Sequence, residues 1–379
     1  MRYFKTISLL LLLLLTGGCV TKYLPEITDQ KNLLVVEGMI TDKPESYSIK
    51  LSISQPLGEA TTRNPLQGAV VTVTDDLGNL YNFFEKSPGI YKSDSTKFTG
   101  IPGRRYSLHI NTYSESTNYN TYESYPVELK QVPKIDSLYY EKVTTGIDEY
   151  NHDIQCAQIY LDASDNGENC RYFRWSYSET WKFQLHWDVP NFTCYRTENS
   201  YVINLKNTST LSENRINKYP LYFVDNSTDR LSVGYSINVS QYSLNQDEYE
   251  YWEKVRSVSE NVGGLYDIVP ASITGNVHCV EEPSQAVLGY FSVCGKTSKR
   301  LFIKDHFTGQ KNFYADCVSD TLTDGGTIPG LGSYVWILMI HQMNPFYIII
   351  TYKQGCADCT TRGVLSKPDF WEDKKSLIK

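Results

Sequence analysis

Apolar and polar residues alternate along much of the chain, a pattern that predicts half-buried β-strands. The clearest case is residues 47–53, where Tyr, Ile, Leu and Ile alternate with Ser, Lys and Ser. Similar short runs begin at Leu33 and recur to about residue 112, with turn signals such as Asp-Asp-Leu-Gly-Asn at 75–79 between them. We therefore expect an Ig-like β-sandwich over residues 33–125.

Strand signals resume beyond Pro133 and continue towards the end of the chain. One helix is predicted near 243–262, where Ser243 and Gln246 form a possible capping box and Tyr249 and Trp252 begin an apolar stripe suited to core packing. The expected fold class is mainly β, with the sandwich followed by a larger β-rich domain over 126–379 that contains this one inserted α-helix.

The first 32 residues follow a different pattern. A short basic head precedes the continuous apolar stretch Ile7–Leu15, and Thr-Gly-Gly leads directly to Cys19. This order predicts a lipoprotein signal peptide over 1–18, a lipid on Cys19 and a polar tether over 19–32. Cleavage by ordinary signal peptidase is the alternative. The apolar stretch is too short to span a bilayer, which needs about 20 residues.

Charge provides no indication of a nucleic-acid partner. The 36 Lys and Arg residues face 43 Asp and Glu residues, a net charge of -7, and no basic run is interleaved with aromatic residues. Tyrosine is abundant at 30 residues, which suits strand packing and exposed contact surfaces equally.

Cysteines other than Cys19 number eight, an even count that favours disulfides in an exported chain. Cys279 and Cys294 are the favoured pair because they flank an apparent hairpin. Cys356 and Cys359 are spaced as Cys-x-x-Cys, for which a structural bridging role is preferred over a redox pair or a zinc site. The full set of disulfide candidates is Cys156, Cys170, Cys194, Cys279, Cys294, Cys317, Cys356 and Cys359.

Catalytic motifs are missing from the sequence: it has no His-Glu-x-x-His, Gly-x-Ser-x-Gly or Walker loop. We expect no enzyme activity, no metal site and no cofactor. The candidate residues for binding a glycan or peptide are the aromatic side chains Trp181, Trp187, Phe192 and Tyr195, which surround a Pro-containing loop. Burial in the core is the alternative for these rings.

Several segments, taken in order, resemble one family of Bacteroidota lipoproteins known only as a domain of unknown function, number 4249. The segments are 34–38 (Leu-Val-Val-Glu-Gly), 40–42, 68–71, 89–91, 100–106, 275–277, 288–291, 356–359, Gly363 and 367–371 (Lys-Pro-Asp-Phe-Trp). The resemblance implies an outer-membrane lipoprotein, facing either the periplasm or the cell surface, often encoded beside a TonB-dependent transporter. It implies no catalytic residues.

These observations predict a non-enzymatic envelope lipoprotein, held to the membrane by its lipid, that binds substrate or acts as a scaffold for a TonB-dependent transporter. Two alternatives remain open. The first is a structural or adhesive surface lipoprotein, and the second is a glycan or peptide hydrolase whose paired carboxylates meet only in space.

Overall fold

The structure is a computed structural model that describes residues 33–55, 64–114, 118–165, 167, 170–261, 273–309, 317–323, 336–342 and 346–371. Strands dominate these residues, and they contain a single α-helix, α2 (Gln246–Asn261). The predicted mainly β fold with one helix near 243–262 is confirmed. The predicted signal peptide, Cys19 and tether lie outside the described residues.

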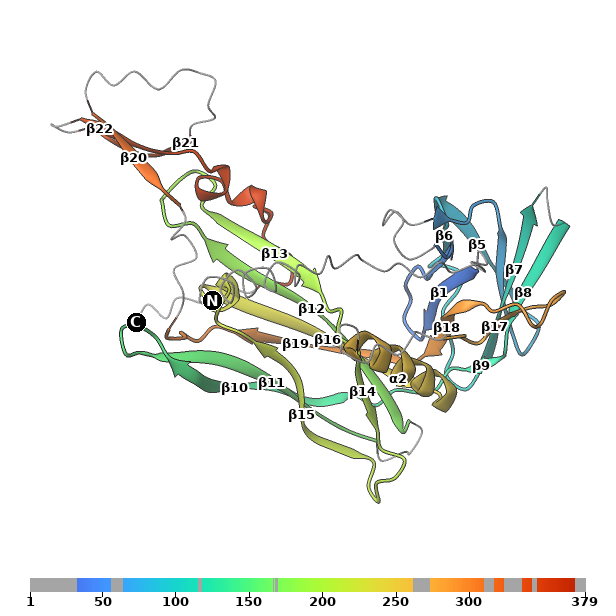
Figure 1. Ribbon diagram of the computed structural model, residues 1–379. Helices are drawn as coiled ribbons and strands as arrows, with labels where there is room; N and C mark the ends of the chain where they lie inside the picture. The colour runs from blue at the N-terminus through green and yellow to red at the C-terminus, as the bar shows by residue number, and fades with distance from the viewer. Residues whose placement is uncertain are drawn as a thin grey trace, which may run out of the picture.

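The first sheet has eleven strands and curls almost closed around one apolar core (Figure 1). The strands form one continuous path, so the separate sheets of an Ig-like sandwich are not confirmed. In spatial order the path is β17 (Val277–Cys279), β8 (Asn118–Ser124), β7 (Arg105–Ser114), β4 (Val70–Asp75), β5 (Leu80–Ser87), β6 (Ile90–Ser93), β2 (Ser48–Ile53), β1 (Leu34–Thr41) and β18 (Leu288–Cys294), with β3 (Asn64–Pro65) beside β2 and β9 (Val127–Glu128) beside β7.

Two of these strands come from far along the chain. β18 pairs in parallel with β1 from Val35↔Leu288 to Thr41↔Cys294, and β17 pairs with β8. The region predicted as a second domain, 126–379, therefore gives three strands, β9, β17 and β18, to the sheet built from 33–125. A parallel pair needs no turn between its strands, so no local sequence signal marks it.

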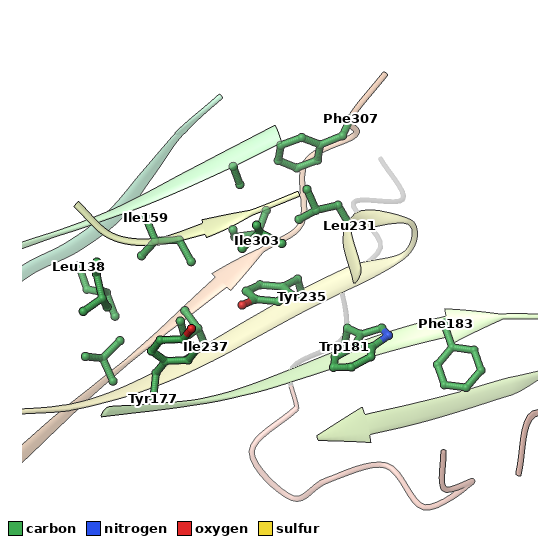
Figure 2. Close-up of a cluster of buried hydrophobic side chains, with 14 of the residues drawn as sticks. Leu138, Ile159, Tyr177, Trp181, Phe183, Leu231, Tyr235, Ile237, Ile303 and Phe307 are labelled. Carbon is green, nitrogen blue, oxygen red and sulfur yellow. The ribbon is translucent and has the colours of Figure 1, made fainter. Parts of the chain in front are cut away.

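Two further sheets face each other across a second core, which Figure 2 shows from Leu138 and Ile159 on one side to Tyr177 and Ile237 on the other. Aromatic contacts cross between them, with ring centroids 4.5 Å apart for Tyr177 and Tyr222. One sheet is β10 (Ile135–Ile147), β11 (Asp153–Ser164) and β15 (Arg215–Val224); the other is β13 (Thr193–Asn199), β12 (Tyr172–Gln184), β16 (Gly234–Leu244) and β19 (Lys296–Ile303), with β14 (Asn204–Asn207) beside β12.

The C-terminal part forms a small fourth sheet and three-residue helical turns. Its strands are β20 (Ser319–Thr323), β22 (Tyr347–Thr351) and β21 (Trp336–His341), followed by η3 (Gln354–Cys356) and η4 (Cys359–Thr361), while η2 (Asp229–Leu231) lies earlier, before β16. Leu338 joins this sheet to the second core.

Helix α2 lies where the first sheet meets the sheet of β12 and β16 (Figure 1). A third, smaller cluster of apolar side chains forms there, and we call this region the joint. It gathers Met39 of β1 and Cys294 of β18, Tyr172 of β12, Tyr242 and Leu244 of β16, Leu205 of β14, and Tyr249 and Trp252 of α2, with Ile203. Packing at the joint holds together strands that are distant in sequence.

Candidate functional site

A pocket of about 300 Å³ opens at the joint, and we call it the joint pocket. Five elements from separate stretches of the chain build it, so it exists only in the folded protein. Its lining is Glu37, Gly38 and Met39 of β1, Ser48 and Lys50 of β2, Arg174 of β12, Tyr251 and Trp252 of α2, and Gly289, Tyr290 and Ser292 of β18.

Strand register places the polar residues of the pocket side by side. Glu37 lies opposite Lys50 on β2 and opposite Tyr290 on β18. The Lys50 ammonium is 3.7 Å from the Glu37 carboxylate, and each side chain is nearly half exposed, at 44% and 49%. Alternation along β1 turns Val36 and Ile40 into the first core and leaves Glu37 and Met39 towards the pocket.

Gly289 is required by the way β18 approaches β1. Its φ is +84°, and a Cβ there would lie 2.0 Å from the carbonyl oxygen of Val36. No other residue fits this position without moving the backbone, because both the left-handed conformation and the close contact exclude a side chain. The adjacent residue, Tyr290, is thereby held against the pocket.

Helix α2 supplies the aromatic wall. The rings of Tyr251 and Tyr290 are 4.8 Å apart, and Tyr251 meets Trp252 edge to face at 5.4 Å. The predicted stripe begins with Tyr249, which is buried, and continues with half-buried Trp252. The last member of the predicted stripe, Val262, lies outside the described residues.

The predicted capping box is wrong. Ser243 lies inside β16, where its hydroxyl donates to the Lys130 carbonyl at 2.6 Å and accepts from the Gly295 amide at 2.9 Å. The first turn of the helix is closed instead by the Tyr249 amide, which donates to the Asn245 carbonyl at 3.0 Å. The Ser243 hydroxyl therefore bonds to residues distant in the sequence and does not cap the helix.

Arg174 is the distinctive cation of the pocket. Its guanidinium carbon is 4.3 Å from the centroid of the Trp252 ring and 5.1 Å from that of Tyr242. It makes no hydrogen bond to any described residue, and its Nε is buried without a partner there. Two aromatic rings therefore hold the planar group in place while its donors remain unused.

Glu248 lies behind the pocket and is fully buried. Its Oε1 accepts from the Ser292 hydroxyl at 2.6 Å and from the Trp252 indole at 3.2 Å, whereas Oε2 has no partner among the described residues. Burial raises the pKa of this carboxyl above 4.5, and the positive charge of Arg174 opposes that rise.

The four predicted ligand residues do not gather around one open surface. Trp181 is 2% exposed, its indole donates to Asp229 Oδ1 at 3.0 Å, and it projects into the second core in Figure 2. Trp187 and Phe192 are half-buried and pack against the same core. Tyr195 is buried against Trp371 and borders a separate hollow of about 600 Å³ beside residues 360–364. Packing in the core explains the position of Trp181, whereas ligand binding by Trp187, Phe192 and Tyr195 stays a prediction.

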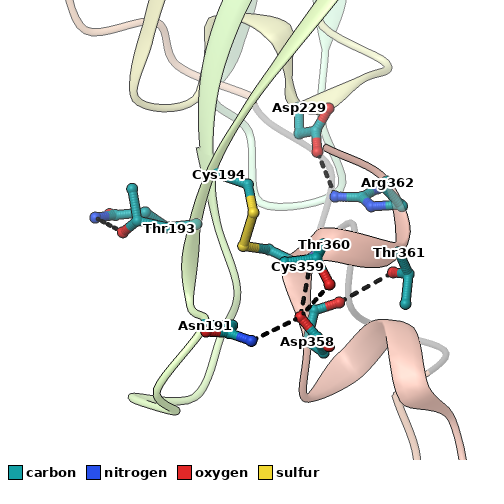
Figure 3. Close-up of a disulfide and its surroundings, with 10 residues drawn as sticks. Asn191, Thr193, Cys194, Asp229, Asp358, Cys359, Thr360, Thr361 and Arg362 are labelled. Atoms are coloured by element: carbon teal, nitrogen blue, oxygen red, sulfur yellow. Dashed lines mark hydrogen bonds and ion pairs between the residues drawn. A yellow bond between two sulfur atoms is a disulfide. The ribbon is translucent and has the colours of Figure 1, made fainter. Parts of the chain in front are cut away.

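Disulfides fasten the C-terminal segment. Cys359 bonds to Cys194 of β13, and Cys356 bonds to Cys317 (Figure 3 shows the first bridge). The two cysteines of the Cys-x-x-Cys motif thus pair with distant partners and not with each other. Their predicted bridging role is confirmed.

The favoured pair Cys279–Cys294 is wrong, because both thiols are free and buried. Residues 279 and 294 do not flank a hairpin: β17 pairs with β8 and β18 pairs with β1, at opposite ends of the sheet path. Cys156 and Cys170, which were also candidates, are free and buried as well.

Polar contacts reinforce the bridge to β13. Asn191 donates to the Asp358 carboxylate at 3.2 Å, and the Arg362 guanidinium donates to Asp229 at 2.7 Å, as the dashed lines in Figure 3 mark. Asp229 therefore connects Trp181 in the core to the C-terminal segment. These interactions hold residues 354–371 against β13 and the second core.

Within the described ranges, no three or more His, Cys, Asp or Glu side chains form a group that could hold a metal ion. No helix in the described part of the chain combines the length and apolar character needed to cross a membrane.

A family model described as a domain of unknown function, DUF4249, matches residues 20–300, which is more than half of the 379-residue chain. The matched range includes every residue that lines the joint pocket. No match was found among curated proteins. The chain therefore belongs to the DUF4249 family.

Proposed function

We propose that this protein is an outer-membrane lipoprotein that works without catalysis as an accessory of a TonB-dependent nutrient-uptake system, binding a small ligand at the joint pocket. The joint pocket is the observation that carries the binding role. It is concave, lined by aromatic rings and a few polar groups, and contains an arginine that donates to no residue that the structure describes. These are the features of small-molecule sites.

Location outside the cytosol is supported by two independent features. The first is the basic head, apolar stretch and small residues that precede Cys19. The second is the pair of disulfides, which persist in oxidising compartments and are rare in the cytosol. A lipid on Cys19 would hold the protein to the membrane without a spanning helix. The partner transporter is proposed from the family resemblance alone.

The anchor is tested by following maturation of the full chain in cells. Globomycin should block processing, and a Cys19→Ser variant should be released from membranes and take up no radiolabelled palmitate. A Cys156→Ser variant is the control, because it changes another cysteine outside the leader. Normal processing in globomycin would overturn the proposal.

The transporter role is tested by purifying the full-length protein from native membranes in a mild detergent. We expect a TonB-dependent transporter to co-purify in a fixed ratio, and deletion of the gene to impair growth on one class of nutrient. Recovery of the protein with neither a transporter nor a bound ligand, together with unchanged growth, would favour a structural or adhesive role instead.

A further inference from the structure

We propose that the joint pocket binds a small molecule carrying a carboxylate, and that Arg174 is the residue that anchors this carboxylate. The inference deepens the proposed function, since it rests on the pocket being a ligand site and adds the chemical class of the ligand. It does not depend on the identity of the transporter.

The first argument is the unused hydrogen-bonding capacity of Arg174. A guanidinium carries five N–H donors in a rigid fork whose geometry matches a carboxylate with two parallel hydrogen bonds. Here the group lines the pocket and donates to no described residue, and its Nε is inaccessible to bulk water. The buried Nε keeps the guanidinium without an acceptor in the described protein, and its remaining N–H groups are available to a ligand that supplies oxygen atoms.

The second argument is that the guanidinium is held ready for such a ligand. Trp252 and Tyr242 lie at 4.3 and 5.1 Å from its central carbon. Trp252 is itself fixed, because its indole N–H donates to the fully buried Glu248. Ser292, which lines the pocket, donates to the same carboxylate. Binding therefore needs little further ordering of the side chains around Arg174.

The third argument is charge. Arg174 and Lys50 are cations at the pocket, and Glu37 offsets Lys50 at 3.7 Å. The surface of the pocket thus carries about one positive charge in excess, and buried Glu248 can only reduce that excess. A carboxylate with a single negative charge matches this balance better than a phosphate, which carries between one and two charges at neutral pH.

The fourth argument concerns size and shape. A volume of about 300 Å³ is at the lower limit of small-molecule pockets, so the ligand has about the size of one ring. Tyr251, Tyr290 and Trp252 offer flat apolar surfaces, and Ser48 and Glu37 offer polar atoms. A carboxylate attached to a hydroxylated or aromatic ring fits both parts of the lining.

The test compares acids with neutral molecules of the same shape. Glucuronate differs from glucose only in having a carboxylate in place of the hydroxymethyl group. Benzoate differs from benzyl alcohol in the same way. Binding to the folded, disulfide-intact protein is followed by calorimetry and by tryptophan fluorescence. We expect at least one acid to bind at least tenfold more tightly than its neutral counterpart, and more tightly than inorganic phosphate.

Substitution of Arg174 then assigns the anchor. Arg174→Gln should weaken binding of that acid roughly ten- to hundredfold, and Arg174→Lys, which keeps the charge but not the fork, should lie between it and the wild type. The matched control is Arg256→Gln, which removes an arginine of α2 that pairs with Glu253 and does not line the pocket. Thermal unfolding without ligand checks that each variant is folded.

Several results would overturn the inference. A folded Arg174→Gln protein that binds the acid as tightly as the wild type would remove Arg174 as the anchor. Equal binding of acid and neutral partner, or tighter binding of phosphate, would remove the carboxylate, although the pocket would remain a binding site as proposed. Absence of binding to every probe at millimolar concentration would also refute the inference, whereas co-purification with a transporter would still stand.

Discussion

The joint and the C-terminal segment are held together in opposite ways. Residues 354–371 have little core of their own and are fastened to the body by two disulfides and by ion pairs such as Arg362–Asp229. The joint is held by apolar packing around α2, and the cysteine that packs there, Cys294, is free and buried. Covalent bonds hold the segment that has little packing of its own, whereas the packed joint contains buried polar atoms that lack a partner within the described ranges.

That difference matters for function because unused polar groups are tolerated only where the surroundings are rigid. Glu248 Oε2 and Arg174 Nε both lack partners among the described residues. Each such group costs free energy when buried, so the packing around it must exceed that cost. In the C-terminal segment the charged groups instead have partners, as Asp358 and Arg362 do. We therefore look for binding at the joint.

The largest effect is expected from breaking the bridge between β13 and η4. Replacing Cys194 and Cys359 together by serine removes a link between residues 165 positions apart, which contributes about 4–5 kcal/mol in the chain-entropy model. We expect residues 354–371 to leave β13 and limited proteolysis to cleave them much faster. Cys279→Ala is the control, since it removes a free thiol. Equal cleavage rates of double variant and wild type would show that packing alone holds the segment.

The next largest effect is expected at Gly289. An alanine there would bring a Cβ to 2.0 Å from the Val36 carbonyl oxygen at φ +84°, so β18 would have to shift away from β1. We expect a loss of about 3 kcal/mol in the free energy of unfolding, measured with chemical denaturant. Gly103→Ala separates the two causes, because Gly103 has φ +85° and nothing within 4 Å. It should lose only about 1 kcal/mol, and equal losses would refute the contact argument.

The sequence predicted individual elements of these two regions but not the pairings between distant segments. Alternation predicted the strand at 47–53, and the apolar stripe at helical spacing predicted α2, because both signals are local. The parallel pairing of β1 with β18 spans about 250 residues and leaves no local trace. For the same reason the partners of Cys356 and Cys359 were not identified, although their bridging role was.

The sequence did not predict most residues of the candidate site. Arg174 alternates with apolar neighbours along β12, so it resembles any outward-facing strand residue until α2 folds over it. Glu248 follows an acidic neighbour at a helix start, where exposure is the ordinary outcome. The aromatic residues around Trp181 were the stronger local signal, and most of them form core. A polar residue that becomes buried through tertiary packing cannot be told from a surface residue by its neighbours in the sequence.

A smaller, pH-dependent effect is expected for Glu248→Gln. Burial raises the pKa of Glu248 above 4.5 in the folded protein, so the group stabilises the fold fully below its unfolded pKa, and that contribution is lost as pH rises through the folded pKa. Each unit of the rise corresponds to about 1.4 kcal/mol. The glutamine variant should therefore gain stability relative to the wild type as pH rises above 4.5.

The comparison needs unfolding curves at several pH values for three proteins. Asp247→Asn is the matched control, because it removes the exposed acid next to Glu248. A pH dependence of the same size in Asp247→Asn would show that the effect does not belong to the buried carboxyl of Glu248. Parallel stability profiles of the wild type and Glu248→Gln would show that the carboxyl titrates alike in the folded and unfolded chain.

The smallest effect on stability is expected for Lys50→Gln. Its ion pair with Glu37 joins two side chains that are nearly half exposed, and such pairs contribute between about 0 and 1 kcal/mol. Lys296→Gln is the sharper comparison, since Lys296 is 24% exposed and reaches Glu45 across the joint at 3.1 Å. We expect Lys296→Gln to lower the unfolding temperature more than Lys50→Gln does. If Lys50→Gln weakens acid binding while leaving the unfolding temperature unchanged, Lys50 contributes to the ligand site and not to the fold; a drop in stability at least as large as that of Lys296→Gln would reverse this assignment.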